Sequence, residues 1–409
     1  MHDSKFFSSL LAPEVGLVSS YDLVAINTAP TIYNLIIDVG QRLGSEHFGI
    51  DDRVGAWDVT MTGVLSRGIG EAVERFALRP RLEADPILGK TFSDTASELP
   101  RITKALRLPS PMPDTRYLQA YRVRRQDGQP FADRVLIDAD WVNLPTSRRA
   151  QQKRWFGTPS GTAAHIGLAS AIDSSLRELI ERDAVTRAWN GLSQIEHVEA
   201  VDVHCKSARK LRQLQRNHPL QIYRVKSSIG SAWTFVAWAV KETQATAGSS
   251  LKACPACAGL HASIEALQVG ALLREMRDNA TKADVVTTNF KDTNCAEVST
   301  FADLSTRRMT FWASAEGVSA WKDWHASSRS RSIQSTHNKT ILTSEDIAAV
   351  GATHVWVDLS PRLPKPVIDK GFRVVKSFIP ELFSLPMSEG EPWNCVPDGN
   401  PFAQWEPLL

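Results

Sequence analysis

Two short segments of the sequence place acidic residues at a spacing that could hold a metal ion. GEAVERF has Glu71 and Glu74 three residues apart, with Arg75 directly after the second, and RELIERD over residues 177–183 repeats the pattern. Residues three apart on a helix project from nearly the same face, so each segment brings two carboxylates together. Two carboxylates repel unless a cation lies between them, and Mg2+ takes carboxylate and phosphate oxygens as ligands.

A simpler interpretation is a solvent-exposed helix face. Glu71 would then pair with Arg75, and Glu178 with Arg182, at the i, i+4 spacing that contributes about 0.3 kcal/mol per pair. The neighbours of both segments are apolar, and partly buried acid pairs need a cation or a charged ligand to offset desolvation. Because an arginine beside such acids can hold phosphates, the two segments together favour a magnesium-nucleotide site, and their repetition indicates an internal duplication.

Amphipathic helices must present these acids. Apolar residues recur at steps of three and four over residues 167–189, which predicts a long helix that carries Glu178 and Glu181. A second helix is predicted over residues 64–78, where Arg79-Pro80 ends it because proline removes a backbone donor.

The rest of the chain mixes strands and helices without a regular βαβ alternation. This order predicts an α+β fold with mixed sheets flanked by helices, and the repeated acids predict that the magnesium-nucleotide site lies between the two duplicated helices. The first sixty residues show no clear period, and residues 99–114 are a proline-rich connection. The predicted strands cover residues 134–142, 220–225, 232–240, 354–360 and 372–378, and further helices cover 207–217 and 262–280.

Composition narrows the classes of function. The chain has 409 residues, 43% of them hydrophobic, and 47 basic against 45 acidic residues leave a net charge of +2. Such a balance supplies no large field for nucleic acid or an anionic membrane, so neither partner is expected. We find no secretion signal and no run approaching the ~20 apolar residues of a spanning helix, so a cytoplasmic protein is expected.

The cysteines leave three interpretations open. Five in a chain of this length do not predict a disulfide framework. Cys254 and Cys257 form a CPAC motif that suits a zinc site, a redox pair or two ordinary buried thiols, the last being favoured. A zinc site would need further ligands, for which His261, Cys205, His204 and Cys295 are available.

The segment TPSGTAAHIGLASAIDSSLRELIERDAVTRAWNG, residues 158–191, resembles the signature of the YcaO family. Its SGTAAH form is most similar to the D-protein cyclodehydratases (SagD/McbD-like) of thiazole/oxazole-modified peptide biosynthesis. THVWVDLSPRLPKPVIDKGFRVVKSFIPEL, residues 353–382, resembles the closing strands of the same family. The resemblance implies a YcaO domain over residues 63–409, with a weakly matched N-terminal region over residues 1–62.

The resemblance also implies roles for individual residues. ATP and Mg2+ would be held by Glu71, Glu74, Arg75, Ser174, Glu178, Glu181 and Arg182. Weaker candidates come from the signature loop, from the two acidic helices and from a third helix: Ser160, His165, Ser170, Arg67, Glu265 and Glu275. Three features depart from the family pattern: Arg67 replaces a serine, Ser170 replaces an acid, and Ala56-Trp57-Asp58 stands near the usual Gly-Lys-Gly.

The function implied by the resemblance is ATP-dependent cyclodehydration of a ribosomal precursor peptide, which forms thiazoline or oxazoline rings. An E1-like (ThiF-like) partner would capture the precursor, and a flavin-dependent azoline dehydrogenase would be a separate chain. Two alternatives stay open. One is peptide thioamide formation with a TfuA-like partner, favoured by a C-terminal NPFAQWEPLL that lacks alternating prolines. The other is a non-catalytic scaffold subunit, favoured by the three departures.

Overall fold

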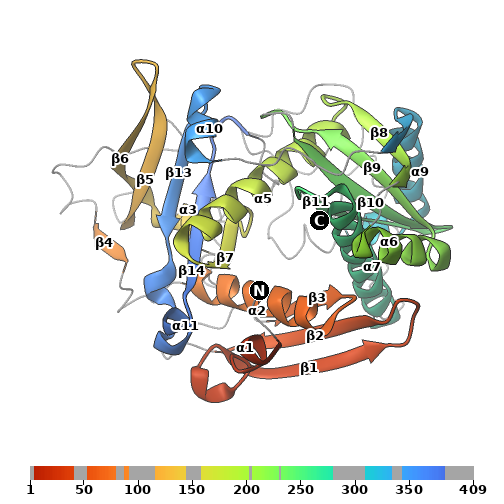
Figure 1. The fold of residues 1–409 in the computed structure, drawn as a ribbon, viewed down its shortest axis with the longest axis horizontal. Helices are drawn as coiled ribbons and strands as arrows, with labels where there is room; N and C mark the ends of the chain where they lie inside the picture. Colours follow the sequence, from red (N-terminus) through yellow and green to blue (C-terminus); the bar gives the residue numbers. More distant parts are fainter. Residues whose placement is uncertain are drawn as a thin grey trace. The chain divides into compact units, whose positions relative to one another are not determined.

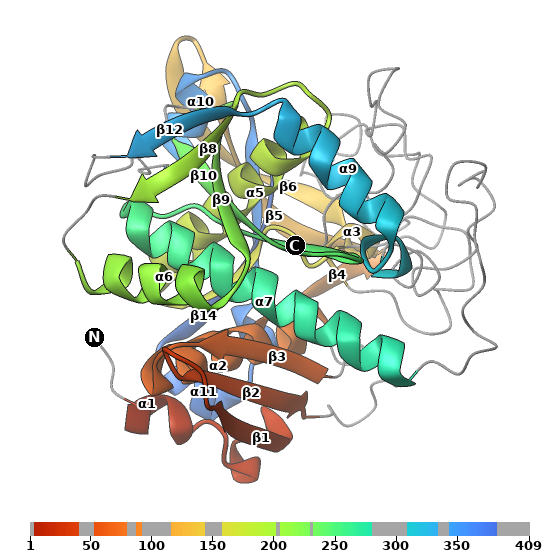
Figure 2. The same cartoon turned by 90° about the vertical axis from the view of Figure 1, so that its right-hand side faces the viewer.

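The computed structural model describes residues 4–40, 53–79, 87–91, 116–143, 158–201, 205–229, 232–279, 309–333 and 343–382. The chain divides into two compact units, drawn in Figures 1 and 2. The first unit comprises Met1–Ile26, Tyr33–Leu179 and Ile341–Leu382, and the second comprises Asn27–Ile32, Ile180–Thr340 and Phe383–Leu409. Sheets of mixed strand order alternate with helices, so the predicted α+β class is confirmed.

The first unit contains two sheets. One has the order β1-β2-β3 and the other the order β4-β5-β13-β14-β7, with β6 paired to β5. The strands are β1 (Val18–Ile26), β2 (Ile32–Val39), β3 (Arg53–Asp58), β4 (Leu88–Thr91), β5 (Arg116–Gln126), β6 (Gln129–Asp138), β7 (Thr162–Ile166), β13 (His354–Asp358) and β14 (Phe372–Phe378). The short helical elements are α1 (Ser4–Ser8), η1 (Pro13–Val15), α3 (Ala139–Val142), α10 (Ser344–Ala349), η4 (Ser360–Arg362) and α11 (Lys365–Asp369).

Helix α2 (Met61–Leu78) is the central element of this unit. Thr60 caps its N-terminus by accepting a hydrogen bond from the Gly63 amide at 3.1 Å, a contact worth about 1 kcal/mol. Its apolar side chains join residues of β2, β3, β5 and β14 in one hydrophobic core. The helix also contacts β7, which positions its polar side chains beside that strand.

The second unit contains a five-stranded sheet of order β11-β10-β9-β8-β12. Its strands are β8 (Ile195–Val201), β9 (Leu220–Lys226), β10 (Trp233–Lys241), β11 (Gln244–Ser250) and β12 (Arg329–Ile333). Its helices are α6 (Lys206–Asn217), α7 (Pro255–Asn279) and α9 (Ala315–Ala326), and Figure 2 shows α6 and α7 side by side. Buried tryptophans dominate the described part of its core: Trp189, Trp238, Trp312, Trp321 and Trp324.

Helix α5 (Leu168–Trp189) runs continuously through the boundary between Leu179 and Ile180. Its bounds and those of α2 agree closely with the predicted helices over residues 167–189 and 64–78. The strand predicted over residues 134–142 was too long, because β6 ends at Asp138 and α3 follows. Within the described part of the first sixty residues, β1, β2 and β3 are strands that the sequence pattern did not predict.

Helix α7 also differs from the prediction, since it begins at Pro255 instead of Ala262. The Cys254 sulfur accepts a hydrogen bond from the Cys257 amide at 3.4 Å, and proline suits the first turn of a helix because it lacks an N–H. Over Pro255–Glu275 the helix is long and apolar enough to cross a membrane by length and composition, which the sequence analysis did not anticipate. It packs on β10 and β11, and 56% of its most apolar window is buried, as expected of a core helix.

Candidate functional site

The predicted acids of α2 lie beside strand β7. Glu74 accepts a hydrogen bond at its Oε1 from the backbone amide of Ala164, 2.8 Å away. Glu71, one turn earlier, lies 3.7 Å from the guanidinium of Arg75. The i, i+4 ion pair predicted for a solvent-exposed face therefore exists, but of the two acids on this helix it involves only Glu71.

The α2 carboxylates and Glu178 of α5 form a crowded acidic cluster in the first unit. Burial raises the pKa of Glu74 well above its usual value, and repulsion from Glu178 and then Glu71 raises it further. Burial also raises the pKa of Glu71, against the opposing charges of Arg75 and Arg67. Partial solvent exposure of Glu71 weakens this effect. A divalent cation bound among these crowded carboxylates would favour their charged forms and offset their mutual repulsion.

A buried lysine lies within the field of the same acids. The Lys376 ammonium, on β14, donates hydrogen bonds to the backbone carbonyls of Thr158 and Ser160. Burial lowers its pKa to about 7, while Glu178 and Glu74 act to raise it and Arg75 to lower it. The sequence analysis missed this residue. The available signal was a lysine directly after the apolar pair Val374-Val375 in the strand FRVVKSF, because lysine is rarely buried.

Residues 158–161, here called the signature turn, owe their backbone shape to Gly161. Its φ of +74° is in the left-handed region, and a Cβ atom there would lie 2.7 Å from the Ser377 carbonyl and 2.8 Å from a Leu179 methyl group. The Gly161 carbonyl accepts a hydrogen bond from the Ser377 amide, which continues the contact between this turn and β14. Ser160, predicted as a site residue, is buried in this turn and contributes its backbone carbonyl to Lys376.

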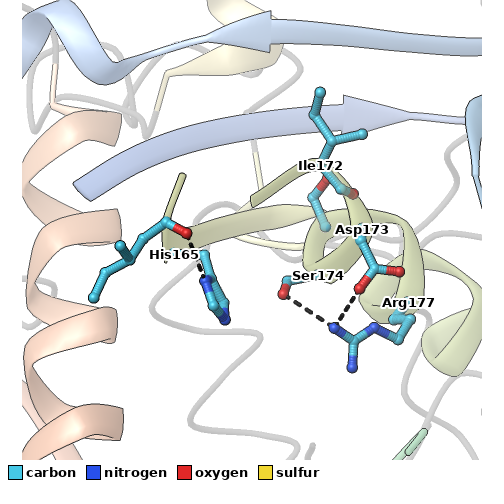
Figure 3. A network of polar contacts seen from close by, with 7 residues as sticks. His165, Ile172, Asp173, Ser174 and Arg177 are labelled. Atoms are coloured by element: carbon cyan, nitrogen blue, oxygen red, sulfur yellow. Dashed lines mark hydrogen bonds and ion pairs between the residues drawn. The ribbon is translucent and has the colours of Figure 1, made fainter. Parts of the chain in front are cut away.

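The hydroxyl of Ser174 belongs to a local network on α5. Arg177 donates to the Asp173 carboxylate at 2.6 Å and to Ser174 Oγ at 3.3 Å (Figure 3). The ion pair in this part of α5 thus joins Arg177 to Asp173, a partner that the sequence analysis did not consider. It fixes the first turns of the helix on the N-terminal side of Glu178.

In the second unit Glu181, one turn after Glu178 on α5, is held by strand β11 and the residues after it. Ser249 Oγ donates to one carboxylate oxygen at 2.5 Å, and the Leu251 amide donates to the other at 2.7 Å. The Ser249 amide in turn donates to Glu265 of α7 at 3.0 Å. Glu265, a weak candidate from sequence, therefore joins Glu181 through Ser249.

The close approach of α7 to β11 brings Glu265 to this position. A Cβ atom on Gly248 would lie 2.3 Å from the Ala262 carbonyl, so a larger residue would separate the helix from the strand. Glu275 lies more than two turns further along α7 and is exposed, away from this contact.

The other weak candidates make local contacts. Arg67 lies one turn before Glu71 on α2, and its charge lowers the pKa of that acid. His165 is exposed on β7 with Nδ1 3.2 Å from the Ile166 carbonyl (Figure 3). Ser170 is half-buried in the first turn of α5. Arg182, which belongs to the main predicted ATP and Mg2+ set, is half-buried on the same helix.

Three cysteines have structural contacts. Cys205 caps α6 by accepting a hydrogen bond from the Ala208 amide at 3.4 Å, and Cys254 caps α7 in the same way. The Cys257 thiol lies 3.3 Å from Ser207 Oγ. No group of three or more histidine, cysteine and acidic side chains suited to a metal occurs among the described residues, and His204 and Cys295 fall outside them.

The chemistry available to the acidic cluster is the binding of a hard cation. Glu71, Glu74 and Glu178 are oxygen donors, and burial and mutual repulsion raise the pKa values of the two acids on α2. Three clustered oxygen donors fit a magnesium ion, and Arg75 adds a positive charge that suits phosphate.

Comparison with known proteins agrees with this chemistry. Residues 65–383 match the model of the family described as YcaO cyclodehydratase, ATP- and Mg2+-binding. No curated protein matched the sequence.

Solved structures show the same fold. A YcaO protein from Methanopyrus kandleri, bound with AMPPCP and Mg2+, is 16% identical with a TM-score of 0.63, over 94% of this chain and 95% of that one. A heterocyclase in complex with substrate and cofactor is 14% identical with a TM-score of 0.63, over 99% of this chain and 56% of that one. A chain of the E. coli microcin synthetase McbBCD complex with pro-MccB17 bound is 12% identical with a TM-score of 0.61, over 95% and 96%.

Proposed function

Because the chain belongs to the YcaO family of ATP- and Mg2+-binding cyclodehydratases, we propose that it activates backbone amides of a ribosomal precursor peptide and forms thiazoline or oxazoline rings. The product would enter the biosynthesis of a bacteriocin-like peptide. The observation that carries the proposal is the acidic cluster of Glu71, Glu74 and Glu178, whose crowded oxygen donors fit a nucleotide-bound magnesium ion.

The chemical problem is a poor leaving group. A Cys, Ser or Thr side chain of the precursor attacks the preceding backbone carbonyl, and the amide oxygen must then depart. ATP with Mg2+ supplies a phosphoryl group that turns this oxygen into a good leaving group.

The chain's own residues would act by binding and orientation. Glu71, Glu74, Glu178 and Glu181 would hold the metal-nucleotide, and Arg75 would place a charge near the phosphates. The hydrogen bonds from Ala164 to Glu74 and from Leu251 to Glu181 fix two of these carboxylates before any ligand binds. Such preorganisation lowers the free-energy cost of reaching the reactive geometry. The nucleophile is a side chain of the precursor, so the protein does not have to supply one.

Charge-removing substitutions test the site. Glu178→Gln and Glu181→Gln change charge at nearly constant shape, and we expect each to lower phosphate release by at least about 100-fold. The assay is phosphate release with the purified partner and precursor, alongside a circular dichroism spectrum that checks the fold. Glu242→Gln, in the exposed turn between β10 and β11, is the matched control and should keep wild-type rates. Full activity in both site variants would refute this assignment.

The partners follow from the same proposal. A solved structure with the same fold belongs to a multi-protein complex with its pro-peptide bound, and we propose an E1-like (ThiF-like) partner that captures the precursor of this chain. A flavin-dependent azoline dehydrogenase would act afterwards as another chain, and the expected compartment is the cytoplasm. Co-purification of the chain with an E1-like protein encoded beside it is the test. Efficient turnover of the precursor by the isolated chain would argue against a required partner.

Two rival functions keep the same fold. Thioamide formation with a TfuA-like partner would add about 16 Da to the peptide by oxygen-to-sulfur exchange, whereas cyclodehydration removes about 18 Da as water. A non-catalytic scaffold is favoured by Arg67, by Ser170 and by the lack of a lysine at residues 56–58. Mass spectrometry of the treated precursor separates the first rival, and a complete lack of ATP consumption with partner and precursor would favour the second.

A further inference from the structure

Lys376 is placed where a charged side chain is costly. Only 1% of the residue is exposed, and its ammonium donates to the Thr158 and Ser160 carbonyls of the signature turn. Burying an ammonium without nearby negative charge costs several kcal/mol, and two neutral carbonyls do not supply that charge. The position therefore calls for anions close to Lys376.

The anions come from the acidic cluster of the first unit. Lys376 pairs with Thr162 in the register of β14 and β7, and two residues further along β7 the Ala164 amide binds Glu74. Glu178 and Glu74 both act on Lys376 in the direction that favours its charged form. The Lys376 cation and the Glu74 carboxylate are thus joined to the same short strand pair, and the charge of Glu178 acts on the same cation.

We propose that Lys376 is a positioning residue that holds the Thr158–Ser160 turn and balances the charges of Glu74 and Glu178 while no metal ion is bound. This inference rests on the proposed metal site and extends it to a residue outside the two acidic helices. The direction in which metal affinity should change follows from this charge balance. Because the lysine charge and a divalent cation repel each other across the same acids, loss of the lysine charge should tighten metal binding. A lysine that served only to hold the turn would instead leave metal affinity unchanged or weaken it when removed.

Charge and hydrogen bonding can be separated by substitution. Lys376→Gln keeps a hydrogen-bond donor for the turn but removes the charge, and Lys376→Arg keeps the charge. Ser377→Ala is the control for disturbance of β14, because it removes a buried hydroxyl from the next residue without changing charge.

Calorimetric titration with Mn2+ alone is the first measurement. We expect Lys376→Gln to bind Mn2+ at least about fivefold more tightly than wild type, and Lys376→Arg and Ser377→Ala to bind within about twofold of it. Unchanged or weaker binding by Lys376→Gln would overturn the proposal.

A second measurement needs no metal. In metal-free buffer, Lys376→Gln should change the equilibrium constant for unfolding of the wild-type chain several-fold. The same substitution should have a smaller effect in a Glu178→Gln background, where less negative charge needs balancing. Equal effects in the two backgrounds would contradict charge balance by Lys376. If that coupling is found but wild type binds no Mn2+, the proposed metal site fails while the pairing of Lys376 with Glu178 stands.

Discussion

A buried histidine beneath the signature turn should make the stability of the first unit depend on pH. His354 of β13 is fully buried, with Nε2 3.0 Å from Ser377 Oγ and Nδ1 2.9 Å from Ser344 Oγ. Ser377 Oγ lies 2.6 Å from Ser175 Oγ of α5. His354, Ser377 and Ser175 are therefore connected by hydrogen bonds next to Lys376. Burial lowers the pKa of His354 to about 3.

The magnitude follows from the difference between the folded and unfolded pKa values. An unfolded histidine has a pKa of about 6.5, so as pH falls below that value the unfolded chain takes up a proton that folded His354 refuses. The stabilisation is fully present above pH 6.5 and is lost progressively between pH 6.5 and pH 3. At pH 5.5 the loss of unfolding free energy from this one residue is about 1.4 kcal/mol. The figure is RT times the logarithm of the proton-binding polynomial of the unfolded state divided by that of the folded state.

The assay compares wild type with His354→Gln at pH 7.5 and pH 5.5. Glutamine carries no ionisable proton and can still bond to a serine hydroxyl, so the variant lacks the pH-dependent part only. The free energy of unfolding is measured in urea by hydrogen exchange of peptides that cover β13 and β14, which reports on the first unit itself.

We expect the stability difference between wild type and His354→Gln to shrink by about 1.4 kcal/mol from pH 7.5 to pH 5.5. His165→Gln, at an exposed histidine of β7, is the control for the loss of an imidazole as such. Parallel pH curves for wild type and His354→Gln would refute the reasoning, because they would mean that the folded chain protonates His354 as readily as the unfolded one.

The remaining predictions concern the two glycine-dependent contacts and the third acidic helix. Gly161→Ala should destabilise the first unit by about 2 kcal/mol or more, as seen in urea unfolding, because a strained φ combines with a clash against the Ser377 carbonyl. Gly128→Ala has a similar φ of +82° in the β5–β6 turn but open space around it, so it should cost only about 1 kcal/mol, and equal losses would disprove the clash. Glu265→Gln should lower phosphate release at least about tenfold through Ser249, whereas Glu275→Gln on the same helix should keep wild-type rates; the reverse order would place the site elsewhere.

The helices that carry the acids were predictable because their signals are local. Proline at position 80 and apolar residues at steps of three and four limited α2 and α5 to within a few residues of their observed bounds. The start of α7 was missed because a cysteine cap is an uncommon signal, and α3 was taken for strand because Trp141 and Val142 suit a strand equally well.

The sequence by itself determined the acids and their spacing. Three-residue steps on two helices place Glu71 with Glu74 and Glu178 with Glu181, whatever the rest of the fold does. Together with the signature residues, that pattern was enough to indicate the family and a magnesium-nucleotide chemistry.

Only the tertiary structure decided what surrounds those acids. The contacts of Glu74 with Ala164, of Glu181 with Leu251 and of Lys376 with the Thr158–Ser160 turn join residues from 70 to 218 positions apart. Strand register and helix packing set such contacts, and neither is encoded in a local window of sequence. The burial that shifts the pKa values of Glu74, Lys376 and His354 has the same origin, because it depends on which distant segments exclude water from each side chain.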